Sequence, residues 1–185
     1  MKLFDIWSKR VPSYDQQYAD LFDKYALKAT SAKGDEAMEL RGKVFASNYE
    51  FYICAFFMGI YSNTDKPTSE KPCDFGHPIE NWGKKSSSER ADFRQIQEYM
   101  FGLLILKSDL DFVALELEED ESVISKAVTS LLKIMEAYTN GGLSVIRDRV
   151  NDDPNALYSI AGPLNELLAY CVCDKKAIED SLIML

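Results

Sequence analysis

The sequence contains only one histidine, His77, and this scarcity limits the chemistry that we expect of the protein. A hydrolase that activates a serine or a cysteine through a general base needs a histidine beside the nucleophile, and no Gly-x-Ser-x-Gly motif accompanies His77. The glycine-rich motifs that hold the phosphates of nucleotides are also missing. We therefore expect a protein that is not an enzyme and that uses no cofactor.

Long hydrophobic runs are missing too. The longest, residues 51–61, is about half of the ~20 residues that cross a bilayer. Asp5 interrupts the apolar N-terminus too early for a secretory signal peptide. The cysteines number only four, and a chain of 185 residues can bury a core without disulfides. We expect reduced thiols and a cytoplasmic protein that makes no contact with a membrane.

Positive charge is scarce, because 21 basic residues stand against 30 acidic ones. A nucleic-acid-binding protein needs an excess of Lys and Arg on at least one face, so we expect no direct nucleic-acid binding. The short basic stretch Lys84, Lys85, Arg90 and Arg94 is more typical of a solvated helix start. Residues 109–121 hold seven acids and no base, a pattern that indicates a solvated edge or a docking surface for a basic partner.

Apolar residues recur at helical spacing along most of the sequence, and no segment of any length alternates as a strand would. Ser13 and Ser47 each begin a capping box, which predicts one helix that starts at Ser13 and ends between Thr30 and Gly34, and another from Ser47 to Tyr61. The second is apolar almost all round, as is typical of a central helix. Further helices are expected over residues 35–44, 88–107, 109–117, 122–138, 143–150 and 154–172, the last with a break at residues 162–163. The fold class that we expect is all-α, with residues 1–185 in a single compact domain.

Two segments between these helices are predicted to be irregular. Asn140-Gly141-Gly142 is expected to end a helix with a left-handed cap. Residues 62–87 are rich in Pro, Gly and Ser and form a long loop, and loops of this length are often functional. Because this loop also holds Phe75, Ile79 and Trp82, we expect it to be ordered and attached to the core by apolar side chains.

A zinc site is the alternative that the cysteines leave open. Cys73 and His77 are four residues apart, and Cys171 and Cys173 would complete a tetrahedral set if the C-terminal helix packed on the long loop. A Cys-x-Cys pair on a helix points its thiols in different directions, so buried, reduced thiols are the plainer interpretation. We expect no metal, and a small zinc-binding module is the alternative.

Three segments carry a family resemblance over roughly residues 47–150. They are the apolar segment 51–59 (Phe-Tyr-Ile-Cys-Ala-Phe-Phe-Met-Gly), the loop that ends in Pro78-Ile79 with Trp82, and the segment 136–143 (Glu-Ala-Tyr-Thr-Asn-Gly-Gly-Leu). Together they resemble the small accessory proteins encoded beside bacterial DNA phosphorothioation and related restriction systems. The resemblance implies a helical protein that takes part in defence against phage or foreign DNA, and it transfers no catalytic residue.

The function that we expect is therefore that of a helical accessory protein, which docks on a larger protein component of a DNA-modification or restriction system. Phe75 and Trp82 are the predicted anchors, because buried aromatic side chains tend to dominate interface energies, and the alternative is that both rings belong to the core of the protein itself. An acidic rim is predicted to steer a basic partner, and it consists of Glu116, Glu118, Glu119, Asp120 and Glu121. The apolar residues 181–185 also make self-association a reasonable expectation.

Overall fold

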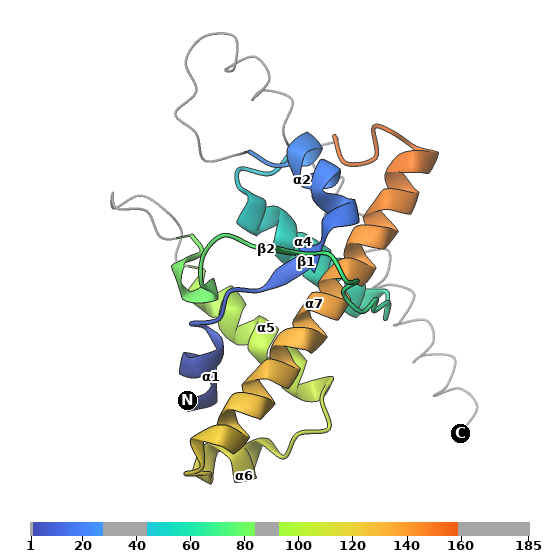
Figure 1. Ribbon diagram of the computed structural model, residues 1–185. Helices are drawn as coiled ribbons and strands as arrows, with labels where there is room; N and C mark the ends of the chain where they lie inside the picture. The colour runs from blue at the N-terminus through green and yellow to red at the C-terminus, as the bar shows by residue number, and fades with distance from the viewer. Residues whose placement is uncertain (1, 28–43, 84–92, 159–185) are drawn as a thin grey trace, which may run out of the picture. The chain divides into compact units, whose positions relative to one another are not determined.

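The protein is mostly helical, with one two-stranded antiparallel sheet (Figure 1). The computed structural model describes residues 2–27, 44–83 and 93–158. The expected helical class is confirmed in this coarse form, and the small sheet departs from a purely α fold. Contacts group the chain into two compact units, Met1–Gln16 with Pro67–Ala137 and Gln17–Lys66 with Tyr138–Leu185. Each unit is built from two separate stretches of chain, and the single domain expected from the length stays a prediction.

The first unit is organised around a cluster of aromatic rings. Phe4, Trp7 and Phe101 lie within 5.4–5.9 Å of one another, ring centre to ring centre, and all three are buried. The elements of this unit in chain order are α1 (Lys2–Trp7), β1 (Ser13–Asp15), β2 (Pro72–Asp74), the 3-10 turn η2 (Ile79–Asn81), α5 (Arg94–Leu106), α6 (Phe112–Leu117) and the first part of α7 (Glu121–Asp152).

The prediction of a helix that begins at Ser13 is wrong, because Ser13 is the first residue of strand β1. The backbone N–H of Ser13 donates to Oε1 of Glu136 at 2.7 Å, and Ser13 pairs with Asp74 across the sheet. These partners from distant parts of the chain replace the local capping bond to Gln16. The helix, α2 (Ala19–Tyr25), begins only after the 3-10 turn η1 (Gln16–Tyr18).

The second unit is organised around α4 (Asn48–Tyr61), as the sequence predicts. Ser47 caps this helix, since its Oγ accepts from the N–H of Glu50 at 3.2 Å. Glu50 completes a variant of the capping box by accepting from the N–H of Ala46 at 2.9 Å. The side chains of α4 are buried on nearly every face, and α2 and the C-terminal part of α7 lie beside it (Figure 1). The prediction of a central apolar helix is therefore confirmed for this unit.

The prediction that a helix ends at Asn140-Gly141-Gly142 is wrong, because α7 continues through these residues as one helix of 32 residues. A Cβ atom on Gly142 would lie 1.7 Å from the carbonyl oxygen of Ala55 in α4, and one on Gly59 would lie 1.9 Å from the carbonyl oxygen of Tyr138. The glycines therefore allow two helix backbones to approach within the second unit. Glycine costs about 1 kcal/mol relative to alanine in a helix, and the close packing offsets that cost.

The other predicted helices agree with the structure in part. The described part of the expected helix over 88–107 is α5, and the expected helix over 109–117 is the shorter α6. Tyr99 is 52% exposed although it is aromatic, whereas the polar Gln97 of the same helix is buried. Residues 154–158 form turns rather than a helix. The expected helix over 35–44 and the residues after 158 lie outside the described residues, except Val44, which precedes α4.

Candidate functional site

The two predicted anchors, Phe75 and Trp82, lie in the core of the first unit. Phe75 is 5% exposed and Trp82 is 1% exposed, and their rings meet edge to face at 5.6 Å. The indole Nε1 of Trp82 donates to the backbone carbonyl of His77 at 3.0 Å. Phe75, Ile79 and Trp82 are buried, as expected for a loop held by apolar side chains, but strand β2 and the turn η2 replace part of the irregular backbone that the sequence predicts. The same burial leaves little of either ring accessible to a partner, and it favours the core alternative over a role as anchors.

The acidic rim has a structural role in part. Both oxygens of the Glu116 carboxylate accept backbone N–H groups at the start of α1, from Lys2 and Leu3, each at 3.0 Å. Nζ of Lys2 donates to the carbonyl of Glu118 at 2.8 Å. These bonds join α1 to α6, and an acid at a helix N-terminus is favoured by the exposed N–H groups there.

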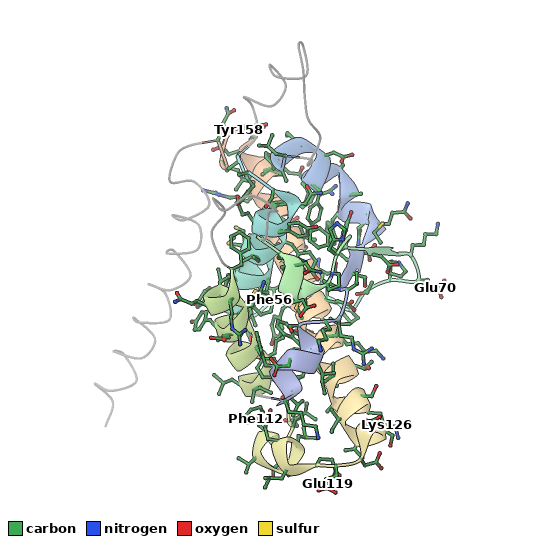
Figure 2. All side chains as sticks on the ribbon, turned by 90° about the vertical axis from the view of Figure 1, so that its left-hand side faces the viewer. Phe56, Glu70, Phe112, Glu119, Lys126 and Tyr158 are labelled. Atoms are coloured by element: carbon green, nitrogen blue, oxygen red, sulfur yellow. The ribbon has the colours of Figure 1, made fainter. Side chains whose placement is uncertain are left out.

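Two further acids of the rim stabilise the turn between α6 and α7. Oε1 of Glu118 accepts from the N–H groups of Glu119 and Asp120, each at 2.9 Å. Oδ1 of Asp120 accepts from the N–H of Ser122 at 2.7 Å, and hydrogen bonds from Ser122 lower the pKa of Asp120. Glu119 and Glu121 remain exposed, and their side chains make no hydrogen bond or ion pair within the described part of the chain. Figure 2 shows Glu119 at the outer edge of this turn.

Helix α6 presents large apolar side chains to solvent. Phe112 packs inward against the ring of Phe101 at 6.3 Å, and Leu115 is buried. Val113 and Leu117 lie one turn apart on the other side of α6, and they are 69% and 78% exposed. We call Val113 and Leu117 the α6 patch. The spacing of Val113 and Leu117 fits a helical period, but the structure places both side chains on the solvent side of the helix.

The zinc alternative is only partly covered by the structure. Cys73 is half-buried in β2 and His77 is exposed in the following loop, while Cys171 and Cys173 lie outside the described residues. Among the residues that the structure describes, no group of three His, Cys, Asp or Glu side chains is placed to hold a metal ion. Cys54 lies on α4, and burial raises the pKa of its thiol to about 12, so it stays protonated and unreactive.

One serine and one lysine lie close together in the second unit. Nζ of Lys66 donates to Oγ of Ser144 at 2.5 Å. Ser144 lies in the interior of α7 and is 8% exposed, so a substrate carbonyl has little access to it. We assign the contact to packing.

Comparisons with family models, curated proteins and solved structures find no match to this sequence. The resemblance to accessory proteins of DNA phosphorothioation systems therefore stays a prediction. Of the helices that the structure describes, none combines the length and the apolar character needed to cross a membrane. The basic residues Lys84, Lys85 and Arg90 lie outside the described residues, and Arg94 begins α5.

The α6 patch was missed because a period of 3.6 residues does not say which stripe of a short helix faces inward. Leu110, Val113, Ala114 and Leu117 fit the period, and so do Phe112 and Leu115 with their neighbours. The side chain with the larger apolar area, Phe112, takes the inner position against Phe101. The position of Phe112 was the one feature of the sequence that could have indicated which side of α6 faces inward.

Proposed function

We propose that the protein is a non-enzymatic accessory protein that acts through protein–protein contacts, and that its docking surface is the α6 patch. The observation that carries this proposal is the exposure of Val113 and Leu117 on one face of α6. Single exposed apolar residues are common. Two large apolar side chains one turn apart on the same helix face, beside acidic residues, are more typical of a contact surface.

The support beneath the α6 patch favours this role. Helix α6 is held in place on its inner side by Phe112 and Leu115, and near its C-terminus by the hydrogen bonds of Glu116 to the start of α1. A docking element that is already rigid loses little conformational entropy when it binds. Leucine and valine side chains that become buried in a partner each contribute roughly 1.5–3 kcal/mol.

The charge beside the patch indicates the chemistry of the partner. Glu119 and Glu121 follow Leu117 within four residues, and their side chains have no hydrogen-bond or ion-pair partners among the described residues. Acids at the rim of an interface increase the association rate with a basic partner and change the affinity less. The partner that we propose has an apolar groove with a basic edge. The family resemblance suggests that it is a larger protein component of a DNA-modification or restriction system.

The experiment compares the tagged protein with the variant Val113→Ser/Leu117→Ser in affinity capture from the source cells. Val11→Ser is the matched control, because Val11 is also exposed, at 39%, and lies outside α6. We expect one component to be captured at near-stoichiometric yield by the wild type and the control and to be lost with the double variant. Equal capture by all three proteins would exclude the α6 patch as the docking surface.

A further inference from the structure

A pocket of about 420 Å³ lies in the first unit between α1, η2 and α5. The lining comes from α1 and the residues after it (Phe4, Asp5, Ser8 and Lys9), from η2 (Glu80) and from α5 (Arg94 and Gln97). The edge-to-face contact of Phe4 with Phe101 at 5.6 Å fixes α1 beside α5. The walls therefore belong to the packed part of the unit.

The floor of the pocket is buried and partly polar. Phe4, Ser8 and Gln97 are each 4% exposed. Nε2 of Gln97 donates to the carbonyl of Ile79 at 2.8 Å, and this bond fixes the orientation of the amide group. The amide oxygen Oε1 of Gln97 accepts no hydrogen bond from a described residue, so it can accept one from a ligand.

The rim of the pocket carries balanced charge. Two bases, Lys9 and Arg94, stand against two acids, Asp5 and Glu80. Arg94 is already engaged, since its Nε pairs with Glu98 at 2.9 Å and its guanidinium lies over the ring of Phe4 at 5.7 Å. Lys9 and Glu80 are different, because their side chains make no ion pair or hydrogen bond among the described residues.

The backbone keeps Lys9 and Glu80 close to each other. The N–H of Glu80 donates to the carbonyl of Ser8 at 2.8 Å, so Glu80 is hydrogen-bonded to the residue that precedes Lys9. The two side chains nevertheless do not pair within the described structure, and both line the same pocket. A ligand with one charge would meet attraction from one of them and repulsion from the other. A ligand with both charges can satisfy both.

We propose that this pocket binds a small zwitterion of the α-amino acid or dipeptide class. The ammonium group of the ligand lies at Glu80 and Oε1 of Gln97, and its carboxylate lies at Lys9. The apolar part of the ligand contacts Phe4. A pocket of this size is within the range of small-molecule sites, and its mixed polar and apolar lining is suited to such a ligand. The site is independent of the α6 patch, since the two share no residue.

The test uses isothermal titration calorimetry and NMR amide shifts with L-leucine and glycyl-L-leucine as probes. The blocked probes N-acetyl-L-leucine and L-leucinamide each lack one of the two charges. We expect at least one zwitterion to bind, with shifts at Ser8, Lys9, Glu80 and Gln97, and each blocked form of leucine to bind at least about tenfold more weakly than leucine, as the loss of one charge-assisted hydrogen bond implies.

Variants separate the pocket from the rest of the surface. Lys9→Gln and Glu80→Gln each remove one charge with little change of shape, and each should weaken zwitterion binding by about tenfold. Lys126→Gln and Glu70→Gln are the matched controls, because both residues are exposed and neither lines the pocket; Figure 2 labels them. Absence of binding by both zwitterions would overturn the proposal. Equal binding of the blocked probes, or equal loss in the control variants, would overturn it as well.

Discussion

The close approach of α4 and α7 in the second unit predicts a specific effect of adding one methyl group. In Gly142→Ala, the new Cβ would lie 1.7 Å from the carbonyl oxygen of Ala55, against 3.4 Å for ordinary contact. The obstacle is backbone, so no side-chain rotation relieves it and the two helices must separate. Gly102→Ala in α5 is the control, because nothing lies within 4 Å of its new Cβ.

The magnitude follows from two opposing terms. Overpacking a well-packed core costs about 1–3 kcal/mol, and more where the backbone has to move. Alanine gains about 1 kcal/mol over glycine in a helix interior. We expect a net loss of at least about 2 kcal/mol in the free energy of unfolding for Gly142→Ala. For Gly102→Ala we expect a gain of about 0.5–1 kcal/mol, because only the helix propensity changes.

The assay is urea denaturation followed by circular dichroism, with the slope checked for a change in the denatured state. Gly59→Ala should be destabilising too, since its Cβ would meet the carbonyl oxygen of Tyr138 at 1.9 Å. The double variant Gly59→Ala/Gly142→Ala should lose less than the two single losses together, because the first substitution already separates the helices. A neutral or stabilising Gly142→Ala would refute the close packing of α4 on α7.

Three further predictions concern the loop, the sheet and the zinc alternative. Trp82→Ala should lower the free energy of unfolding by about 3–5 kcal/mol, because the ring is core, and unchanged stability in urea denaturation would contradict its burial. Burial raises the pKa of Glu136 above 4.5, so the carboxyl group keeps its proton to higher pH in the folded protein than in the unfolded chain. The free energy of unfolding should therefore fall as the pH rises from about 4.5 through the folded pKa. Glu136→Gln should flatten this part of the pH dependence of unfolding, since glutamine can still accept from Ser13, and an unchanged profile would count against the burial effect. Elemental analysis of protein purified without added metal should find less than about 0.1 zinc per chain, because a structural zinc site binds with about 10–16 kcal/mol and would retain its ion. A value near one would favour the zinc alternative of Cys73, His77, Cys171 and Cys173.

Local patterns predicted the parts of the fold that depend on local interactions. Helix α4 is indicated by the Ser47 capping box and by the apolar run that follows it. Both signals depend on residues close together in the sequence, so the sequence alone could predict that helix. The same motif at Ser13 failed, because Glu136 and the partner strand β2 compete for the same backbone groups. Asp74 in β2 lies 61 residues from Ser13 and Glu136 lies 123 residues from it, and no local rule includes partners at such separations.

The glycines of α7 show the same limit in another form. Asn140-Gly141-Gly142 has the sequence of a helix cap, yet the backbone of Ala55 and that of Thr64 lie against it and require the absence of a Cβ. The candidate site depends on a similar choice. Whether Val113 or Phe112 faces inward is decided by the ring of Phe101, and that contact appears only when the first unit is assembled.

The measurement that tests the central claim most directly is quantitative capture of the partner by the wild type, by Val113→Ser/Leu117→Ser and by Val11→Ser, with circular dichroism to show that all three are folded. Both substituted side chains of the double variant are exposed, so stability should change little. The account predicts that the double variant remains folded and loses the partner, while Val11→Ser keeps it. A folded double variant that captures the partner as well as the wild type would contradict the account.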